Sequence, residues 1–118
     1  MITGRVNTLG VPAITLDVAG QSWNALIDTG FNGDLELPRR LRTSLGARWI
    51  GTVTSILAAG QTVDEDRYQL PFSFDGKVTL AEATFVACEE ILIGTHLLRD
   101  HRLEINFVTK DVLIERVR

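Results

Sequence analysis

The chain has 118 residues, of which 12 are Lys or Arg and 15 are Asp or Glu, so its formal net charge is −3. This length accommodates one domain with a substantial core and excludes two domains of ordinary size. Because no stretch gathers basic and aromatic side chains along one face, we do not expect nucleic acid as a partner.

The apolar content and the single cysteine indicate the class of protein and the compartment in which it is expected to fold. Hydrophobic residues make up 45% of the chain and charged residues 23%, as in ordinary globular proteins. Cys88 has no partner for an internal disulfide, and the N-terminus lacks a secretory pattern. No apolar run reaches the ~20 residues of a membrane-spanning helix. We therefore expect one soluble, cytoplasmic domain over residues 1–118, with no membrane partner.

Apolar residues recur mainly with a period of two, and Gly, Asp or Asn interrupts the chain at short intervals, which predicts many short strands. On one expected strand, Ile14, Leu16 and Val18 share a face. The segments expected to contain strands are, in chain order, 2–10, 12–30, 49–70, 68–88, 91–93 and 102–117.

Two segments depart from simple strand alternation. Pro38 suits a first helical position and Gly46 can end a helix in the left-handed conformation, so 38–46 is expected to form a helix of about two turns. Residues 49–70 have two β-prone arms around the small-residue tip Ala58–Gln61, which predicts a long hairpin projecting from the body.

The strongest chemical signature lies in WNALIDTGFNGDLELP, residues 23–38. Asp28 follows an apolar strand, Gly30 permits close approach of the backbone, and the Thr29 hydroxyl can lock the loop through a hydrogen bond. A plain turn also favours Asp and Gly. The triplet alone therefore leaves a structural turn open beside a rigid carboxylate site.

The segment ALIDTGFNGDLELP, residues 25–38, resembles the active-site loop of the retropepsin-like aspartic proteases. ILIGTHLLRD, residues 91–100, resembles their second signature, in which two apolar residues and a glycine precede a short helix. Phe31 after the triplet is similar to a prokaryotic branch that reads D-T-G-F, whereas viral members usually carry Ala there. The resemblance implies an all-β chain folded as a closed acid-protease barrel, with one or two short helices.

The resemblance also assigns a site. It implies that Asp28, Thr29 and Gly30 form the catalytic loop, and that the hairpin Ser55–Asp66 closes over the substrate as a flap. The residues expected to contact substrate are Phe31, Asn32, Ala58, Ala59, Gly60 and Ile93.

One acid of this kind implies two chains. Peptide hydrolysis without a metal or a covalent nucleophile can be run by two carboxylates that share a proton. No other Asp in the chain is followed by Thr or Ser and then Gly. Because a twofold axis brings a residue near it to its own copy, we expect a homodimeric aspartic endopeptidase whose two Asp28 side chains act on a peptide or protein substrate.

Phe31 offers the pair no hydroxyl, so the expected pH optimum is less acidic than that of gastric-type relatives.

One departure from the viral pattern bears on the dimer. Viral members carry an Arg just after the second-signature glycine, which pairs with an acid downstream of the catalytic loop and braces the dimer. Thr95 and Asn32 occupy those places here, so the brace is expected to differ. The terminal strands, including VLIERV at 112–117, are candidates, because viral relatives interleave their chain ends.

Other polar residues give weaker signals. His96 and His101 are five apart with no Cys or third His nearby, which favours surface or helix-end roles over a metal site. We expect neither a metal nor another cofactor. Asp64–Asp66, on the return arm of the hairpin, are expected to form a charged rim that protects an exposed edge strand.

Two interpretations from other classes remain open. The same fold can serve as a catalytically silent peptide-binding or assembly module, in which the triplet is only a structural turn. An unrelated β-barrel ligand binder is a third possibility, and it leaves the two signatures unexplained.

Overall fold

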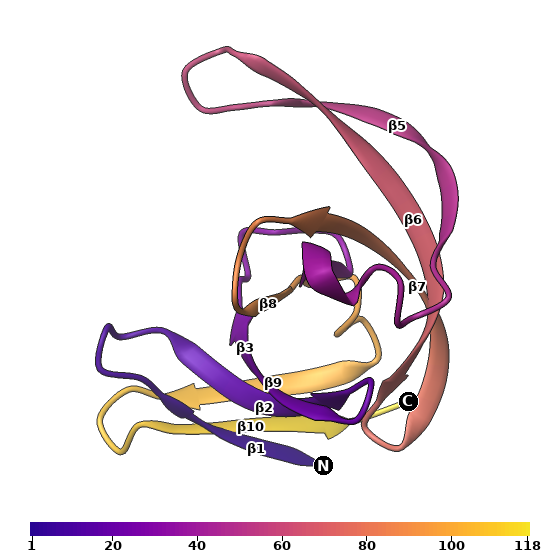
Figure 1. Cartoon of the computed structure of the whole chain (residues 1–118). Helices are drawn as coiled ribbons and strands as arrows, with labels where there is room; N and C mark the ends of the chain where they lie inside the picture. The colour runs from indigo at the N-terminus through magenta and orange to yellow at the C-terminus, as the bar shows by residue number, and fades with distance from the viewer.

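The computed structural model describes residues 1–118, and strands supply nearly all of its regular structure (Figure 1). Ten strands form one sheet in the order β5-β6-β7-β4-β8-β3-β2-β1-β10-β9. Their bounds are β1 Ile2–Val6, β2 Pro12–Val18, β3 Gln21–Ile27, β4 Leu35–Pro38, β5 Arg48–Ile56, β6 Thr62–Phe74, β7 Lys77–Val86, β8 Ile91–Ile93, β9 His101–Asn106 and β10 Asp111–Arg116. The prediction of an all-β chain is confirmed.

Alternating side chains of these strands form the core. In β2, Ile14, Leu16 and Val18 are buried as predicted, while Thr15 and Asp17 face solvent. The same alternation runs through the other strands of the body, and 21 buried apolar residues make one continuous cluster inside the curled sheet.

Three pairings position the middle of the sheet. The short strand β8 lies parallel to β3 and antiparallel to β4, and β4 in turn lies parallel to β7. Strands far apart in sequence therefore meet at the end of β3. Ile91, Ile93, Leu35 and Leu37 point from these strands into the core and are at most 1% exposed, whereas the alternate residues Leu92 and Glu36 are only partly buried.

The predicted helices are shorter than expected. In place of two helical turns over 38–46, the structure has one 3-10 helix, Arg39–Leu41, followed by turns. Pro38 remains extended and belongs to β4, and Leu41 is the one buried side chain of the 3-10 helix. A longer helix has too little apolar surface to bury, since short helices depend on packing. Residues 95–100 form turns and no regular helix.

Strands β5 and β6 form the predicted long hairpin, which projects from the body at the top of Figure 1. The Leu57 amide donates to the Gln61 carbonyl over 2.7 Å and closes the tip, and Gly60 has φ +84° there. No residue of β5 is buried, so the outer arm is held mainly by its hydrogen bonds to β6. This hairpin contains residues 55–66, which the sequence analysis expects to act as a flap.

The two edges of the sheet are β5 and β9, and between them the sheet curls around its core. Within the chain, β1 pairs with β2 and β10, and β10 pairs with β1 and β9. The second edge of β9 is open, so the terminal strands stay the predicted candidates for the dimer brace. The structure contains no helix of the length and apolarity that crossing a membrane requires.

Candidate active site

Backbone hydrogen bonds fix the position of Asp28 at the end of β3. The buried residues Ala25 and Ile27 anchor the strand, and Ile27 pairs with Ile93 of β8. The Asp28 amide donates to the Ile93 carbonyl over 3.0 Å, and the Phe31 amide donates back to the Asp28 carbonyl over 3.1 Å. The expected contact of Ile93 with substrate needs correction: its side chain is 0% exposed and packs in the core, so Ile93 positions the loop.

The side chain of Asp28 is held by the protein on one oxygen only. The Gly30 amide donates to Asp28 Oδ1 over 2.9 Å. A Cβ on Gly30 would lie 3.2 Å from the same oxygen, so the glycine permits this close approach. Asp28 Oδ2 has no partner within the chain, and the residue is partly exposed. Thr29 is exposed and makes none of the loop-locking hydrogen bonds that the sequence analysis allowed.

Phe31 and two glycines join the two signature segments. A Cβ on Gly94 would lie 2.1 Å from the Gly33 carbonyl oxygen and 2.8 Å from the Phe31 ring, and one on Gly33 would lie 2.7 Å from that ring. The Thr95 amide donates to the Phe31 carbonyl over 2.8 Å, and the His96 amide donates to that of Gly33 over 3.1 Å. The two glycines therefore let the segments approach closely enough to hydrogen-bond.

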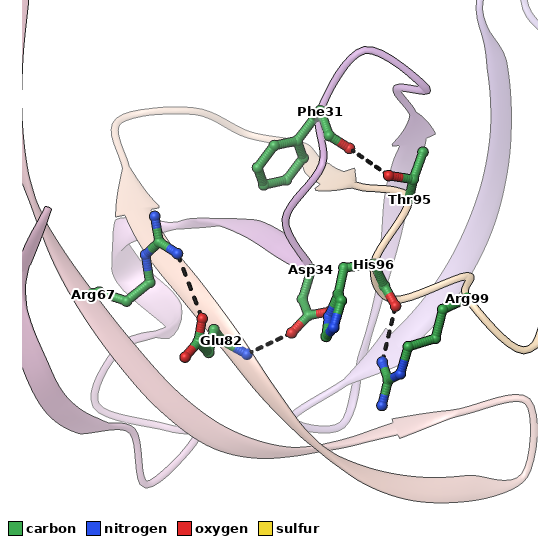
Figure 2. A network of polar contacts seen from close by, with 7 residues as sticks. All are labelled: Phe31, Asp34, Arg67, Glu82, Thr95, His96 and Arg99. Atoms are coloured by element: carbon green, nitrogen blue, oxygen red, sulfur yellow. Dashed lines mark hydrogen bonds and ion pairs between the residues drawn. The ribbon is translucent and has the colours of Figure 1, made fainter. Parts of the chain in front are cut away.

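Sequence reasoning missed a buried acid that spans this junction (Figure 2). The Asp34 side chain is 4% exposed, its Oδ1 lies 2.6 Å from His96 Nδ1, and its Oδ2 accepts the Glu82 amide over 2.9 Å. It thereby links the loop that carries Asp28 to the segment after β8 and to β7. His96 was expected at the surface. Its ring is half-exposed, and it also contacts a buried carboxylate.

The Asp34–His96 pair lies close in sequence to the positions at which the viral pattern has an Arg and its acid. The viral Arg and acid correspond to Thr95 and Asn32, and the pair found here lies one residue further on in one segment and two in the other. The one signal in the sequence for this pair was that Asp34 stands directly before the apolar strand LELP. Its partner comes from a segment distant in sequence, so spacing alone did not reveal the pair.

A cavity of about 230 Å³ lies between the catalytic loop, β7 and the lower part of the hairpin. Phe31 and Asn32, both predicted to contact substrate, line it together with Glu36 and Glu65. Burial, together with the nearby carboxylates of Glu65 and Asp28, raises the pKa of Glu36. Asp34 and Glu82 also line it and Arg67 is the one basic residue there, so the lining is predominantly acidic beside the loop that carries Asp28.

A second groove, of about 320 Å³, begins at Asp28 and Thr29 and shares no lining residue with this cavity. Apart from Asp28 its lining carries no charge. The other lining residues are Val11, Pro12, Leu26, Ile27, Leu92, Ile105 and Phe107. Asp28 thus stands at the edge of an apolar surface and near an acidic cavity.

The remaining predicted residues lie on the hairpin. Ala58, Ala59 and Gly60 are exposed at its tip, far out from the body in Figure 1. Asp64–Asp66 lie on the part of β6 that pairs with β5 alone, because β6 pairs with β7 only from Tyr68 onward, so the other edge of the strand is open there as expected. Their side chains brace the hairpin: Thr54 donates to Asp64 over 2.6 Å, and Thr52 and Trp49 donate to Asp66 over 3.1 Å.

His101 is buried on another part of the sheet, contrary to the predicted surface position. Its side chain is 3% exposed, its ring meets Phe74 edge-on at 5.3 Å, and its Nε2 lies 3.5 Å from Asp75 Oδ2. Burial, with a further effect of Arg116, lowers the pKa of His101. No group of three or more His, Cys, Asp or Glu side chains comes together in an arrangement suited to a metal ion.

Comparison with known proteins rests on structure. No protein-family model and no curated protein matches the sequence. The crystal structure of a retropepsin-like aspartic protease from Rickettsia conorii matches 98% of this chain and 89% of its own, with TM-score 0.70 and 18% identity. The foamy viral protease-reverse transcriptase in complex with RNA/DNA hybrid matches 80% of this chain with TM-score 0.61 and 20% identity.

A second structure of the foamy viral enzyme, in complex with double-stranded DNA, matches 80% of this chain with TM-score 0.58 and 19% identity. The matched part is 13% of the first viral chain and 16% of the second. Sequence identities this low establish the fold and leave the activity to be argued from the site. The chain has the fold of the retropepsin-like aspartic proteases.

Proposed function

We propose that this protein is a homodimeric aspartic endopeptidase of the prokaryotic D-T-G-F type that acts in the cytoplasm. The observation that carries the proposal is the setting of Asp28. Backbone bonds to β8 hold this residue rigidly, one of its carboxylate oxygens accepts the Gly30 amide, and the other is open. The fold shared with the Rickettsia protease supports the same conclusion.

The chemistry follows from two such carboxylates sharing one proton. The ionised Asp28 takes a proton from a water molecule, whose oxygen attacks the peptide carbonyl carbon, while the protonated Asp28 of the second copy donates to the carbonyl oxygen. On collapse, the second Asp28 takes a proton from a hydroxyl of the tetrahedral intermediate, the C–N bond breaks, and the first Asp28 gives its proton to the leaving nitrogen. Both acids are then ready for another cycle.

The substrate is a peptide in extended form, lying between the catalytic loop and the hairpin. Phe31 and Asn32 line the cavity at that place, and strand addition is the usual way such a groove holds a peptide. Glu36 and Glu65 in the lining disfavour acidic side chains nearby. Closure of the hairpin would bring Ala58–Gly60 over the bound peptide and exclude water.

Asp28→Asn tests the proposal directly. This substitution removes the proton that the pair shares, so peptide-library cleavage should fall by roughly 10³-fold or more while circular dichroism stays unchanged. The matched control is Asp17→Asn, an exposed acid on β2 that lies outside both cavities and should leave cleavage intact. Silence of the wild type, together with peptide binding by both proteins, would establish the catalytically silent module instead.

The pH profile supplies a second test. A pair that holds one proton only over a limited range gives a bell-shaped dependence of the cleavage rate on pH. Phe31 offers no hydroxyl to the pair, so the maximum should lie above that of gastric-type enzymes. Maximal turnover near about pH 2 would contradict this assignment of the pair's surroundings.

A further inference from the structure

The buried ring of His101 has no hydrogen-bond partner within the chain. Its side chain is 3% exposed, and neither Nδ1 nor Nε2 makes a hydrogen bond. Asp75 Oδ2 lies 3.5 Å from Nε2, beyond the distance of about 2.7–3.2 Å at which an N–H group bonds to an oxygen. Because buried polar side chains in native proteins are nearly always bonded to protein, ordered water or an ion, this ring is set up to bond a group from outside the chain.

The ring faces a cavity of about 70 Å³. Phe74 and Leu97 supply the apolar part of the lining, and Phe74 meets the imidazole edge-on at 5.3 Å. A water molecule occupies about 30 Å³ in the liquid, so the space suits a small ion and cannot enclose a nucleotide. In Figure 1 the end of β10 lies beside the turn between β6 and β7 at this place. The cavity shares no lining residue with the acidic cavity or with the groove at Asp28.

Three cations from separate elements line the same cavity. They are Lys77 of β7, Arg99 of the turns at 95–100, and Arg116 of β10. Neither Lys77 nor Arg116 makes an ion pair within the chain. Arg99 donates from Nη1 to the His96 carbonyl over 2.9 Å and keeps its other N–H groups. Three of the 12 basic residues therefore meet at one small cavity, and an anion there would relieve their repulsion.

The fold aims these groups at one place. Arg116 is the register partner of His101 in the β9–β10 pair, so the two side chains lie on the same face of the sheet. Thr79 of β7 adds a hydroxyl donor to the lining. The one acid of the lining, Asp100, is paired with Arg118 over 3.2 Å. The cavity therefore presents mainly N–H and O–H donors and an excess of positive charge.

We propose that this cavity binds a small oxyanion of the phosphate class. The planar guanidinium groups of Arg99 and Arg116 match the oxygens of such an ion, and Lys77 adds a point charge. An imidazole N–H of His101 donates to the ion and so gains the bond that it lacks within the chain. The size of the cavity favours inorganic phosphate over a phosphate group on a larger molecule. The site is independent of Asp28 and of peptide cleavage.

Titration calorimetry of the whole protein with sodium phosphate at neutral pH tests the site. Lys77→Gln and Arg116→Gln each remove one cation from the lining and should raise the phosphate dissociation constant by roughly tenfold or more. Arg102→Gln is the matched control, because Arg102 is an exposed residue of β9 that pairs with Glu104 outside the cavity. It removes the same charge and should bind phosphate as the wild type does. Equal losses in all three variants would overturn the inference, since phosphate would then respond to net charge alone.

His101→Phe gives a second readout, by scanning calorimetry. The substitution removes both ring nitrogens and keeps an aromatic ring, so without phosphate the variant should be at least as stable as the wild type. With phosphate at about ten times its dissociation constant, the Tm of the wild type should rise by roughly 4 °C, and the variant should lose most of this rise. Sodium chloride at equal ionic strength should not reproduce it. A wild type that responds alike to the two salts overturns the inference.

AMP distinguishes the free ion from the same group on a larger molecule. Because the cavity is small, AMP should bind more weakly than inorganic phosphate in the same titration. Binding of AMP as tight as that of phosphate would overturn the free ion as the ligand. None of these measurements depends on cleavage, so a negative result here leaves the proposed function standing.

Discussion

Asp34 is a buried carboxylate whose stability depends on its partners. Its Oδ1 faces the His96 ring at 2.6 Å and its Oδ2 accepts a backbone amide. A buried acid that loses a partner keeps its desolvation penalty, so the loss exceeds the net contribution of the bond itself. The half-exposed His96 therefore matters to the fold as well as to the surface.

The first prediction concerns His96→Ala. This change leaves Asp34 Oδ1 without its partner, so the free energy of unfolding should fall by about 1–3 kcal/mol in urea at neutral pH. His96→Asn, which keeps a short hydrogen-bond donor, is the control and should lose less. Because the same pair links the catalytic loop to β7, kcat should fall more than KM rises. Equal stability of the alanine variant and the wild type would refute this role.

His101 gives a prediction for acid stability. Burial lowers the pKa of His101 below its ordinary value of 6.5, so the unfolded chain takes up the proton more readily than the folded one. Stability is therefore fully present above 6.5 and falls as the pH drops below it. Asp75, Asp100 and Arg116 also act on the ring, and burial is the largest effect.

The measurement is the free energy of unfolding between about pH 7.5 and about pH 5. His101→Gln cannot take up a proton, so its stability should decline less over this window than that of the wild type. The two proteins differ only at residue 101, and the difference between the two curves therefore isolates His101. Parallel curves would contradict the assignment.

Among the elements, local pattern predicted the strands and the catalytic loop, but not the pairings between distant segments. Alternation placed Ile14, Leu16 and Val18 in the core, and the D-T-G triplet located Asp28. The Asp34–His96 pair escaped prediction because its two partners come from separate segments that only the parallel β3–β8 and antiparallel β4–β8 pairings bring together.

The expected helix at 38–46 failed for a related reason. Pro38 and Gly46 are good local signals for a helix, and Gly46 does adopt φ +61°. The pairing of β4 with β7 nevertheless keeps the chain extended through Pro38, and residues 39–46 have little apolar surface to bury in a helix. Tertiary pairing overrode local preference.

The hairpin of β5 and β6 offers a prediction at this scale. No residue of β5 is buried, so the outer hairpin should contribute little to stability. Replacing residues 54–64 by Asn-Gly joins the paired residues Val53 and Glu65 through a two-residue turn. The free energy of unfolding should change by less than about 0.5 kcal/mol. Cleavage should fall by about tenfold or more, because the substrate loses its cover. Unchanged cleavage would show that the hairpin is not a flap.

For the whole molecule, association and stability should be linked. A dimer that binds its second copy only when folded gains stability with protein concentration. The Tm should therefore rise by roughly 3–5 °C for each tenfold increase in concentration, by scanning calorimetry. A Tm independent of concentration in the wild type would exclude a dimer of this kind.

The parallel pairing of β3 with β8 has a consequence for how the molecule forms. Ala25 and Ile91 are neighbours in the sheet but far apart along the chain, and the Asp28 amide finds its acceptor only on Ile93. Contacts of such long sequence separation slow folding, because a large loop must close first. A growing chain on the ribosome therefore lacks an ordered acid until nearly all of it has emerged. If the proposed function is correct, a nascent chain has no competent acid with which to cleave itself before β8 is made.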